Sequence, residues 1–431
     1  MNLLVIGAGY VGLTMSVCFA ELGHSVICID KQKSKINALL KGELTIFEKD
    51  LDKLLVKNLQ SKRLKFDISM KKSVENADVV MIAVGTPFEG KLNGYNQSGI
   101  YSVAKEIARF INKYRVIVIK STVEVGTCDK VEQIIKETNP KADFDVVSIP
   151  EFLREGSAVY DFFNPERIIV GTGSPRAKDI IKELHKPLKK KKLVFTSRRS
   201  SEIIKCASNA FLATKVHFIN EMADFCEKVG GNVCEVAYGM GLDKRIGREF
   251  LKPGPGYGGG CFPKDTKALA SLGKRVGASF NLIETVICAN ENRIKGFAQK
   301  ILSCVKDIKN PKVAFLGLAF KSGTDDCRCS PGVDIVLELI NKGVKVCVYD
   351  PVAMKNAKTI LKSSVFYAKD EYEAAKGADI IVFATEWKQF KFLDWTKLSK
   401  IVNNKIIFDM RNIVDKQETL KHGFECCKIG C

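Results

Sequence analysis

Short, mostly apolar runs recur along the first part of the chain, and longer segments with helical periodicity separate them. The runs are Leu3–Ile6, Ser25–Ile29, Ala77–Val84 and Val116–Ile119. An apolar run of four to eight residues that ends at glycine, proline or polar residues is typical of a buried strand. Strands that alternate with helices predict a doubly wound parallel sheet, which binds its ligands at the carboxyl ends of the strands.

The last third of the chain repeats this pattern. Apolar runs at Lys312–Gly317, Val344–Asp350, Ala378–Thr385 and Ile406–Asp409 predict a second sheet of the same kind. This second set has no Gly-x-Gly-x-x-Gly sequence after its first strand. We therefore expect the second sheet to bind something other than a dinucleotide.

Two long segments with helical periodicity lie between the predicted sheets, over residues 200–229 and 266–307, the latter interrupted near Gly277. Ile203, Ala207 and Phe211 belong to the apolar face of the first segment. The predicted fold is therefore α/β, with two Rossmann-like doubly wound parallel-sheet domains joined by a central helical layer. Its boundaries are expected at 1–199, 200–307 and 308–431.

The composition is that of a globular protein, with 46% hydrophobic and 27% charged residues in a chain of 431. No segment approaches the roughly 18 apolar residues of a membrane span. The first apolar run leads directly into glycines without a basic leader, so we expect a soluble, cytoplasmic protein without a membrane partner. The net charge of +19 fits a solvated lysine-rich surface or an anionic partner. Aromatic residues are not interleaved with the basic ones, which favours a phosphorylated small molecule over nucleic acid.

Fifteen cysteines occur, but their spacing argues against both disulfides and metal. There is no Cys-x-x-Cys and there are only four histidines, so no metal site is expected. Most cysteines are expected to be small core residues, Cys288 among them. The Cys327/Cys329 and Cys426/Cys427 pairs are interpreted as incidental.

The first strand leads into a dinucleotide-type turn. Gly7, Gly9 and Gly12 form Gly-x-Gly-x-x-Gly between a predicted strand and a predicted helix, and Asp30 ends the next strand. Gly9 lets the backbone approach a pyrophosphate at the helix N-terminus. A carboxylate at position 30 binds ribose hydroxyls and repels a 2′-phosphate, so the sequence predicts NAD rather than NADP.

Cys261 differs from the other cysteines. It follows three glycines and precedes Pro263, which suits the first turn of a helix. A sulfur at a helix N-terminus close to Lys264 is favoured as the nucleophilic thiolate. A buried structural cysteine is the alternative, but this Gly-rich loop offers no core in which to bury it.

Two further sets of polar residues each permit two interpretations. Lys205 and Asn209 lie four apart on one helix face, where they can stabilise an oxyanion or simply mark a solvated helix edge. Glu151 and Glu155 follow an apolar run, where they can supply a general base or form the charged first turn of a helix. The residues alone leave both choices open.

Taken together, the chain resembles the nucleotide-sugar dehydrogenase family along almost its whole length. The matching motifs are GAGYVG (7–12), VGTP (84–87), STVEVGT (121–127), PEFLREG (150–156), NAFLATKVHFINE (209–221), FLKPGPGYGGGCFPKD (250–265), LAFKSGTDDCR (318–328) with SP (330–331), and TEW (385–387). Within the family, the resemblance is to the branch that oxidises UDP-glucose. It implies an NAD-binding domain, a central domain that carries the cysteine loop and dimerises, and a UDP-sugar-binding domain.

The resemblance also implies an activity, namely four-electron oxidation of UDP-glucose to UDP-glucuronate with NAD. Cys261 would form a thiohemiacetal and then a thioester. Lys205 and Asn209 would hold the C6 oxygen, Asp265 and Thr122 would position water, and Glu151 would act as the general base. The implied NAD contacts, beyond Gly7, Gly9 and Gly12, are Val11, Asp30, Lys35, Thr86, Thr122, Glu155, Lys264 and Arg328. The implied substrate contacts are Glu151, Phe152, Leu153, Arg154, Glu155, Lys205, Asn209, Phe250, Leu251, Lys252, Pro253, Gly254, Gly258, Lys321 and Arg411, with Arg245 lent across a homodimer.

Three other functions are weighed against this one. A sibling enzyme that oxidises UDP-N-acetylmannosamine or GDP-mannose is the nearest alternative. A non-catalytic NAD-binding regulator or nucleic-acid-binding protein would not need Cys261, Lys205, Asn209 and Asp265 together. A 2-hydroxy-acid dehydrogenase would need a histidine base, and none of the four histidines lies in a suitable motif.

Overall fold

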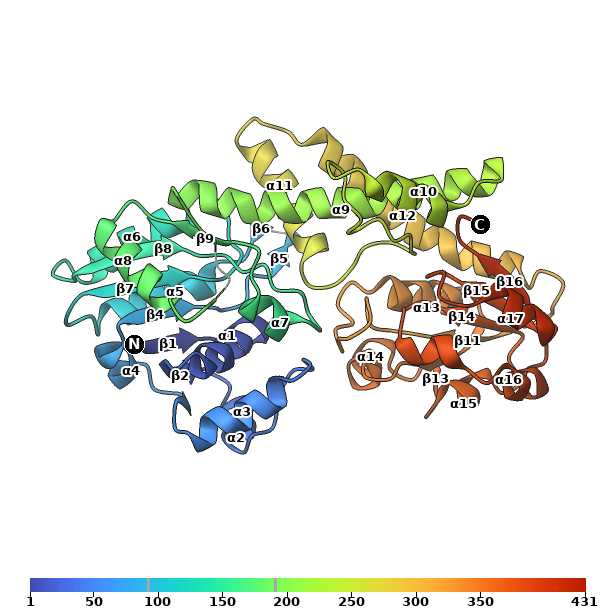
Figure 1. The fold of residues 1–431 in the computed structure, drawn as a ribbon, viewed down its shortest axis with the longest axis horizontal. Coiled ribbons are helices and arrows are strands. Elements are labelled where there is room, and N and C mark those ends of the chain that lie inside the picture. The colour runs from blue at the N-terminus through green and yellow to red at the C-terminus, as the bar shows by residue number, and fades with distance from the viewer. Residues whose placement is uncertain (91–93, 190–191) are drawn as a thin grey trace. The chain divides into compact units, whose positions relative to one another are not determined.

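The computed structural model describes residues 1–90, 94–189 and 192–431 (Figure 1). These residues divide into two compact units. Unit 1 comprises residues 1–208 and 271–278, and unit 2 comprises residues 209–270 and 279–431. Helix α9 (Arg198–Val229) contributes its first residues to unit 1 and the remainder to unit 2.

Unit 1 is built on a sheet whose strand order, within the described residues, is β10-β9-β8-β7-β4-β1-β2-β3. Its strands are β1 (Asn2–Ile6), β2 (Ser25–Ile29), β3 (Leu64–Asp67), β4 (Val79–Ile82), β7 (Arg115–Ile119), β8 (Phe144–Ser148), β9 (Ile168–Gly171) and β10 (Leu193–Thr196). The strands from β3 to β8 are parallel, as predicted. β9 pairs antiparallel with β8 and parallel with β10, so these last two strands run in the opposite direction.

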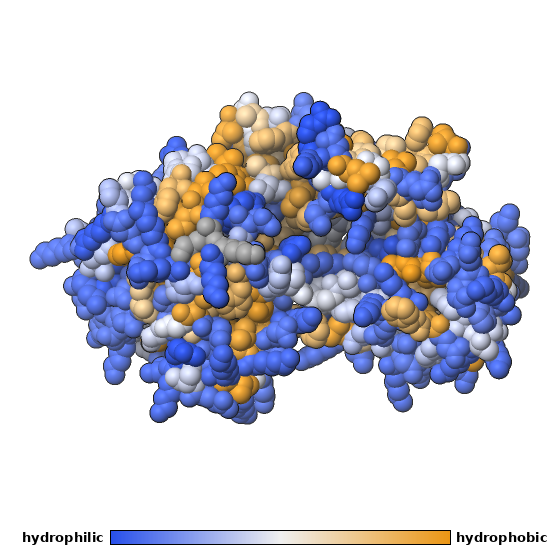
Figure 2. Space-filling model, viewed as in Figure 1, coloured by the Kyte–Doolittle hydropathy of each residue, from blue (hydrophilic) through white to orange (hydrophobic). Residues whose placement is uncertain are grey.

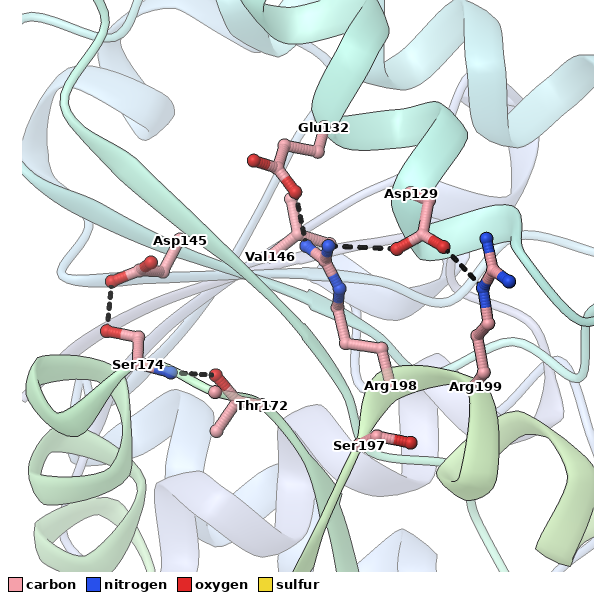
Figure 3. Close-up of a pocket in the computed structure, with 10 residues that line it drawn as sticks. Asp129, Glu132, Asp145, Val146, Thr172, Ser174, Ser197, Arg198 and Arg199 are labelled. Atoms are coloured by element: carbon pink, nitrogen blue, oxygen red, sulfur yellow. Dashed lines mark hydrogen bonds and ion pairs between the residues drawn. The ribbon is translucent and has the colours of Figure 1, made fainter.

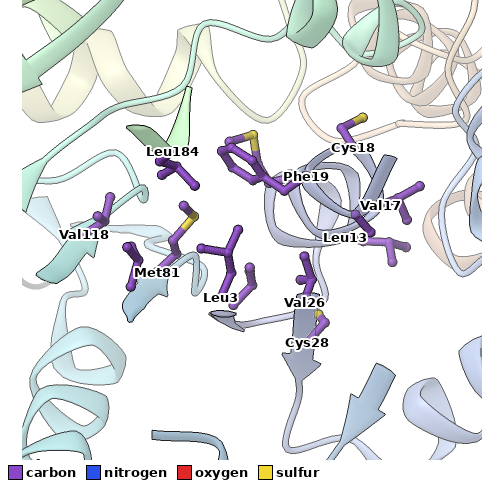
Figure 4. Close-up of a cluster of buried hydrophobic side chains, with 14 of the residues drawn as sticks. Leu3, Leu13, Val17, Cys18, Phe19, Val26, Cys28, Met81, Val118 and Leu184 are labelled. Atoms are coloured by element: carbon purple, nitrogen blue, oxygen red, sulfur yellow. The ribbon is translucent and has the colours of Figure 1, made fainter. Parts of the chain in front are cut away.

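Apolar side chains cover both faces of this sheet, which explains its continuous apolar strands. Leu3 and Val5 point into one core (Figure 4), whereas Leu4 and Ile6 point into the core on the other face. The helices that cover these cores are α1 (Tyr10–Glu21), α2 (Lys33–Leu40), α3 (Leu51–Gln60), α4 (Lys71–Asn76), α5 (Ser98–Ala108), α6 (Thr127–Thr138), α7 (Ala158–Phe163) and α8 (Pro175–Leu184). A short hairpin, β5 (Phe88–Glu89) and β6 (Gly94–Tyr95), lies apart from the sheet.

Unit 2 repeats the central topology of unit 1. In the part of the chain that is described, its parallel sheet has the order β13-β12-β11-β14-β15-β16, which matches β3-β2-β1-β4-β7-β8 strand for strand. The strands are β11 (Lys312–Leu316), β12 (Lys345–Tyr349), β13 (Phe366–Tyr367), β14 (Ile380–Phe383), β15 (Ile406–Asp409) and β16 (Glu425–Lys428). The last strand lies in the cysteine-rich tail, which the sequence pattern did not identify as a strand.

The helices from α9 onward fall into two groups, and the end of α11, from residue 271, belongs to unit 1. Three of them follow α9 in the segment between the sheets: α10 (Val233–Leu242), α11 (Phe262–Arg275) and α12 (Asn281–Ser303). The others cover the second sheet: α13 (Pro331–Asn341), α14 (Met354–Leu361), α15 (Glu371–Ala375), the 3₁₀ helix η2 (Lys388–Phe392), α16 (Trp395–Ile401) and α17 (Lys416–Lys421). No helix among the described residues combines the length and apolar character that crossing a bilayer requires.

Helix α9 carries large apolar side chains that are exposed to solvent. Phe211, Phe218, Phe225 and Val229 are 66%, 45%, 57% and 60% exposed. Their spacing of seven, seven and four residues places them on one face of the helix. Figure 2 shows apolar surface along α9 and α10. The predicted apolar face of α9 is thus exposed at Phe211, and the expectation that Cys288 is a core residue is wrong, because it is exposed on α12.

Candidate active site

The glycine turn after β1 has the geometry of a phosphate-binding loop. A Cβ added to Gly12 would lie 1.8 Å from the carbonyl oxygen of Gly7, and one added to Gly7 would lie 2.6 Å from that of Ala83. Both glycines are therefore required for close packing, and Gly7 also has a φ of +105°. Gly9 differs, because its Cβ position has no protein atom within 4 Å. Gly9 caps α1 without a side-chain hydrogen bond, so the first N–H groups of this helix are available to an anion.

Asp30 follows β2 at the same edge of the sheet. Its carboxylate accepts hydrogen bonds from the backbone N–H groups of Ala8 and Gln32, both at 2.9 Å, and pairs with Lys35 at 3.3 Å. Partial burial opposes ionisation, but these bonds and the lysine charge outweigh it and lower the pKa of Asp30 below its usual range. Asp30 is thus a fixed carboxylate next to the glycine turn, as binding of a ribose requires. The residues of this edge therefore fit NAD.

The loops after β4 and β7 lie at the same edge, because Ile82 pairs with both Ile6 and Ile119. The hydroxyl of Thr86 donates to the carbonyl oxygen of Thr122 at 2.7 Å and joins the two loops. The structure therefore brings Thr86 and Thr122, both predicted NAD contacts, to the edge that carries the glycine turn.

The corresponding edge of the second sheet is built differently. Gly317 repeats the positive φ of Gly7, and Asp350 follows β12 as Asp30 follows β2. Asp350, however, is 1% exposed and accepts hydrogen bonds from the backbone of Leu318 and Ala319 and from the indole of Trp387. Its carboxylate is engaged by the protein itself. This engagement agrees with the prediction that the second sheet binds something other than a dinucleotide.

A buried ion pair lies beside the carboxyl ends of the strands in unit 1. Lys205 on α9 and Glu151 after β8 are 3.1 Å apart, and their side chains are only 5% and 7% exposed. The backbone N–H of Leu153 also donates to Glu151, at 2.7 Å. Lys205 is therefore not a solvated helix-edge residue. Glu151 is not in the first turn of a helix either, since α7 begins at Ala158.

Lys120 joins this charged group and was missed by the sequence interpretation. It directly follows β7 and is 6% exposed. Burial is the largest cause of a pKa lowered to about 8; the charge of Glu151 opposes the shift and the charge of Lys205 adds to it. The signal in the sequence is a lysine directly after the apolar run Val116–Ile119. A lysine at this position is recognised as a residue of the site only once the fold brings the end of β7 close to Glu151.

In unit 2, Cys261 immediately precedes α11, and its carbonyl oxygen accepts the first helical hydrogen bond from Asp265. Asp265 is fully buried and receives a 2.6 Å hydrogen bond from the side-chain amide of Asn209. Lys264 forms an ion pair with the other oxygen of Asp265. The half-buried sulfur therefore lies at a helix N-terminus whose first turn is fixed by a buried carboxylate–amide pair.

The glycines before Cys261 permit close packing against the segment that follows β11. A Cβ added to Gly260 would lie 2.4 Å from the guanidinium of Arg328, and one added to Gly258 would lie 2.2 Å from the carbonyl oxygen of Cys329. Asp326 holds Arg328 through two hydrogen bonds, at 2.9 and 2.6 Å. A fixed guanidinium thus lies beside the cysteine loop. Positive charge and a helix N-terminus together favour anionic groups at this point.

Two predicted substrate residues of unit 2, Gly254 and Arg411, lie against each other. The Gly254 N–H donates to Asn220 at 2.8 Å, and a Cβ at Gly254 would lie 2.7 Å from the Arg411 guanidinium. Arg411 donates to the carbonyl oxygens of Ala384 and Phe320, at 2.8 and 3.2 Å. Arg411 is thus fixed against the loop that leads to Cys261, an arrangement that suits the binding of a phosphate.

Other predicted residues are placed less tightly. Arg154 binds Asp161 in a two-pronged ion pair at the surface of unit 1. Arg245 pairs with Asp243, and its side chain is 89% exposed. Phe152 lies under the guanidinium of Arg167, at 4.1 Å from the ring centroid. The side chain of Arg245 is therefore directed to solvent and to Asp243.

A cavity of about 460 Å³ in unit 1 lies away from these residues (Figure 3). It adjoins Asp145, which pairs with Val116 near the amino ends of β8 and β7, opposite to the glycine turn. Its charged side chains pair with one another, since Arg198 contacts both Asp129 and Glu132. This cavity is therefore not assigned to the dinucleotide.

The two sites define the class of the protein. A dinucleotide turn with a ribose-type carboxylate is typical of a dinucleotide-dependent dehydrogenase, and a cysteine at a helix N-terminus is a candidate nucleophile. Residues 1–189, 199–292 and 314–416 match, in this order, the NAD binding, central and UDP binding domains of the UDP-glucose/GDP-mannose dehydrogenase family. The chain belongs to this family, and its dinucleotide is NAD.

Individual relatives agree with this assignment. A UDP-glucose 6-dehydrogenase of Rhizobium meliloti (strain 1021) is 49% identical, with 100% of this chain and 99% of the relative covered. The solved structure of a UDP-glucose dehydrogenase from Pyrobaculum islandicum is 36% identical and superimposes with a TM-score of 0.90, covering 95% of this chain and 94% of that one. A UDP-D-ManNAc dehydrogenase from Pyrococcus horikoshii is 27% identical, with a TM-score of 0.86 and coverage of 100% and 99%.

Proposed function

We propose that the protein oxidises UDP-glucose to UDP-glucuronate, with two NAD consumed for each sugar and Cys261 as the nucleophile. The observation that carries the proposal is Cys261 at the start of α11, where a buried Asn209–Asp265 pair fixes the first turn. Full-length similarity to UDP-glucose 6-dehydrogenases supports the choice of substrate.

The proposed reaction has two oxidations and one hydrolysis, and bound NAD supplies the hydride acceptor for both oxidations. Lys205 and Asn209, one turn apart on α9, hold the C6 oxygen as the alcohol loses its proton and hydride to give the aldehyde. The Cys261 thiolate adds to the aldehyde carbon, and the new alkoxide takes up a proton from solvent to give a thiohemiacetal. Loss of a second hydride to the bound acceptor and of that proton to solvent leaves a thioester on Cys261.

Hydrolysis of the thioester then needs an activated water. Glu151 is the proposed general base, and its contacts with Lys205 and the Leu153 N–H keep the carboxylate oriented. Asp265 and Thr122 help to position the water. Addition of water to the thioester carbon releases the carboxylate product and returns Cys261 to the thiolate, which completes the cycle.

The remaining predicted contacts divide between cofactor and substrate. For NAD we propose contacts from the glycine turn with Val11, Asp30, Lys35, Thr86, Thr122, Glu155, Lys264 and Arg328. For the sugar nucleotide we propose residues 151–155, 250–254 and Gly258, with Lys321 and Arg411 on the diphosphate. Arg411 is the best supported of these cations, because two backbone carbonyl groups already fix its guanidinium.

A substrate panel tests the proposal. The purified protein is mixed with NAD and UDP-glucose, UDP-N-acetylmannosamine or GDP-mannose, and NADH formation is followed by absorbance. We expect the highest kcat/KM with UDP-glucose. A higher kcat/KM with either of the other two sugar nucleotides would show that this sugar nucleotide, and not UDP-glucose, is the substrate. No NADH with any of them would refute a catalytic role.

We further propose that the protein is a homodimer through its central helices and that the partner copy is the occupant of the exposed face of α9. Four large apolar side chains on one helix face are a poor match for water and a good match for a second copy of the same face. Arg245, which is 89% exposed, is then available to the substrate of the partner. Phe218→Asp should convert the dimer to a monomer in analytical ultracentrifugation, whereas Phe392→Asp, at another exposed phenylalanine, should not. A wild-type chain that sediments as a monomer would refute the dimer.

We also propose a cytoplasmic location. All fifteen cysteines are free thiols in the structure, as is typical of a reducing compartment. Fractionation of cells that express the full chain tests this location, and recovery of the protein outside the cytoplasm would contradict it.

A further inference from the structure

The cysteine-rich end of the chain is anchored within unit 2. Strand β16 pairs with β15, and Gly430 follows it with a φ of +67°. The Gly430 N–H donates to Glu227 of α9 at 3.1 Å, and its carbonyl oxygen accepts from the Val233 N–H at 2.8 Å. The C-terminal residues therefore have fixed neighbours on the helices.

Two thiols meet where this strand passes the end of α12. Cys304 directly follows α12 and Cys427 lies on β16, 123 residues later, with their sulfur atoms 3.8 Å apart. Both side chains are half-buried at the edge of the apolar core of unit 2. Among the described residues, no cluster of histidine, cysteine or acidic side chains could hold a metal ion. The pair therefore points to thiol chemistry and not to metal binding.

The two sulfurs differ in character. The Cys304 thiol donates a hydrogen bond to the Cys427 sulfur. This bond lowers the pKa of Cys427 to about 7 and raises the pKa of Cys304. Cys427 is thus the sulfur of the pair that ionises more readily, and a thiolate is the reactive form towards oxidants.

We propose that Cys304 and Cys427 are a peroxide-reactive dithiol site, which closes to a disulfide and fastens the last strand to α12. The Cys427 thiolate attacks one oxygen of a hydroperoxide and breaks the O–O bond, which gives a sulfenic acid and releases water or an alcohol. The Cys304 sulfur then attacks the sulfenic sulfur, forms the S–S bond and releases water. Two thiols are oxidised and one peroxide is reduced.

The geometry permits this closure with little movement. A disulfide needs its sulfurs at about 2.05 Å, so the pair must approach by roughly 1.8 Å, within reach of side-chain rotation. Cys304 caps the C-terminus of α12, just beyond its last helical residue. The site is separate from Cys261, so it neither depends on the proposed catalytic mechanism nor tests it.

The test uses the full, reduced protein and hydrogen peroxide at about one equivalent. Remaining thiols are blocked with an alkylating agent, and peptides are mapped by mass spectrometry without reduction. We expect a cross-linked peptide that joins Cys304 to Cys427, lighter than the two thiol peptides by two hydrogen atoms and split by dithiothreitol. The cross-link should disappear in Cys304→Ser and Cys427→Ser and persist in Cys288→Ser, a control at an exposed cysteine of the same helix.

Two further measurements test the sulfenic acid intermediate and the effect of the disulfide on stability. In Cys304→Ser, Cys427 should be trapped as a sulfenic acid by a dimedone reagent, because the resolving thiol is gone. In the wild type, oxidation should raise the thermal unfolding temperature of unit 2, and dithiothreitol should reverse the rise. Peroxide that leaves both thiols free to alkylate, or that links Cys431 to Cys234 instead, would overturn the proposal. The wild-type map alone suffices if a serine variant does not fold.

Discussion

Gly9 offers the sharpest test of the dinucleotide site, because the structure separates its role in folding from its role in binding. Its Cβ position has no protein atom within 4 Å, and its φ of −79° is accessible to any residue. Gly9→Ala should therefore fold normally. Its free energy of unfolding should stay within about 0.5 kcal/mol of the wild type, or rise by about 0.4–1 kcal/mol because alanine makes the unfolded chain less flexible. The methyl group, however, fills the space over the first turn of α1, where the phosphate must lie.

The size of the effect follows from the contact that is lost. A hydrogen bond from a backbone N–H to a charged oxygen contributes about 1.5–3 kcal/mol. At about 1.4 kcal/mol per tenfold change, the Kd for NAD should rise by roughly ten- to a hundredfold. Isothermal titration calorimetry measures the Kd, and thermal unfolding of the NAD-free protein measures the stability.

The matched control is Gly173→Ala in the same unit. Gly173 also has no atom near its Cβ position and has an unstrained φ, but it follows β9, away from the glycine turn. NAD affinity in this variant should equal that of the wild type. If Gly9→Ala binds NAD within twofold of the wild type, the phosphate does not lie over Gly9 and the account of the loop is wrong.

Three further predictions concern the charged groups and the cysteine. Cys261→Ser should bind NAD within about twofold of the wild type by calorimetry yet form no thioester, and full turnover by this variant would exclude covalent catalysis. Lys205→Met should lower the free energy of unfolding in denaturant by about 3–5 kcal/mol because it removes the cation that pairs with the buried carboxylate of Glu151. Lys57→Met, which breaks an ion pair whose lysine is 58% exposed, should cost about 0–1 kcal/mol, and equal losses in the two variants would contradict the burial argument. The pKa of Lys120 falls from 10.5 to about 8 on folding, so between these pH values the unfolded chain binds more protons and stability rises with pH. Across this pH range the free energy of unfolding of the wild type should rise by about 3 kcal/mol more than that of Lys120→Met. If it does not, Lys120 is exposed to water and the argument from burial is wrong.

Local signals in the sequence predicted much of the fold. The apolar runs marked β1, β2, β4, β7, β11, β12, β14 and β15 to within about two residues, because strands buried on both faces are continuously apolar. The position of Cys261 before α11 was equally accessible, since glycines and Pro263 define the start of a helix locally. Strand β16 was missed because its polar, cysteine-rich residues show no apolar run.

Features that depend on distant residues were not predictable in this way. The reversed direction of β9 and β10 depends on how their connections cross the sheet, which no local pattern records. Lys205 and Glu151 are 54 positions apart, so their pairing follows only once α9 and β8 are packed. The same holds for Lys120, whose buried position distinguishes it from the many surface lysines.

The stoichiometry of NADH formation tests the central claim most directly. Purified protein and excess NAD receive a limiting amount of UDP-glucose, and the NADH absorbance is followed to its end. The account predicts two NADH for each UDP-glucose, because the sugar passes through an aldehyde and a Cys261 thioester to the acid. One NADH for each sugar would mean that the aldehyde is released, and it would contradict the roles given to Cys261 and Glu151.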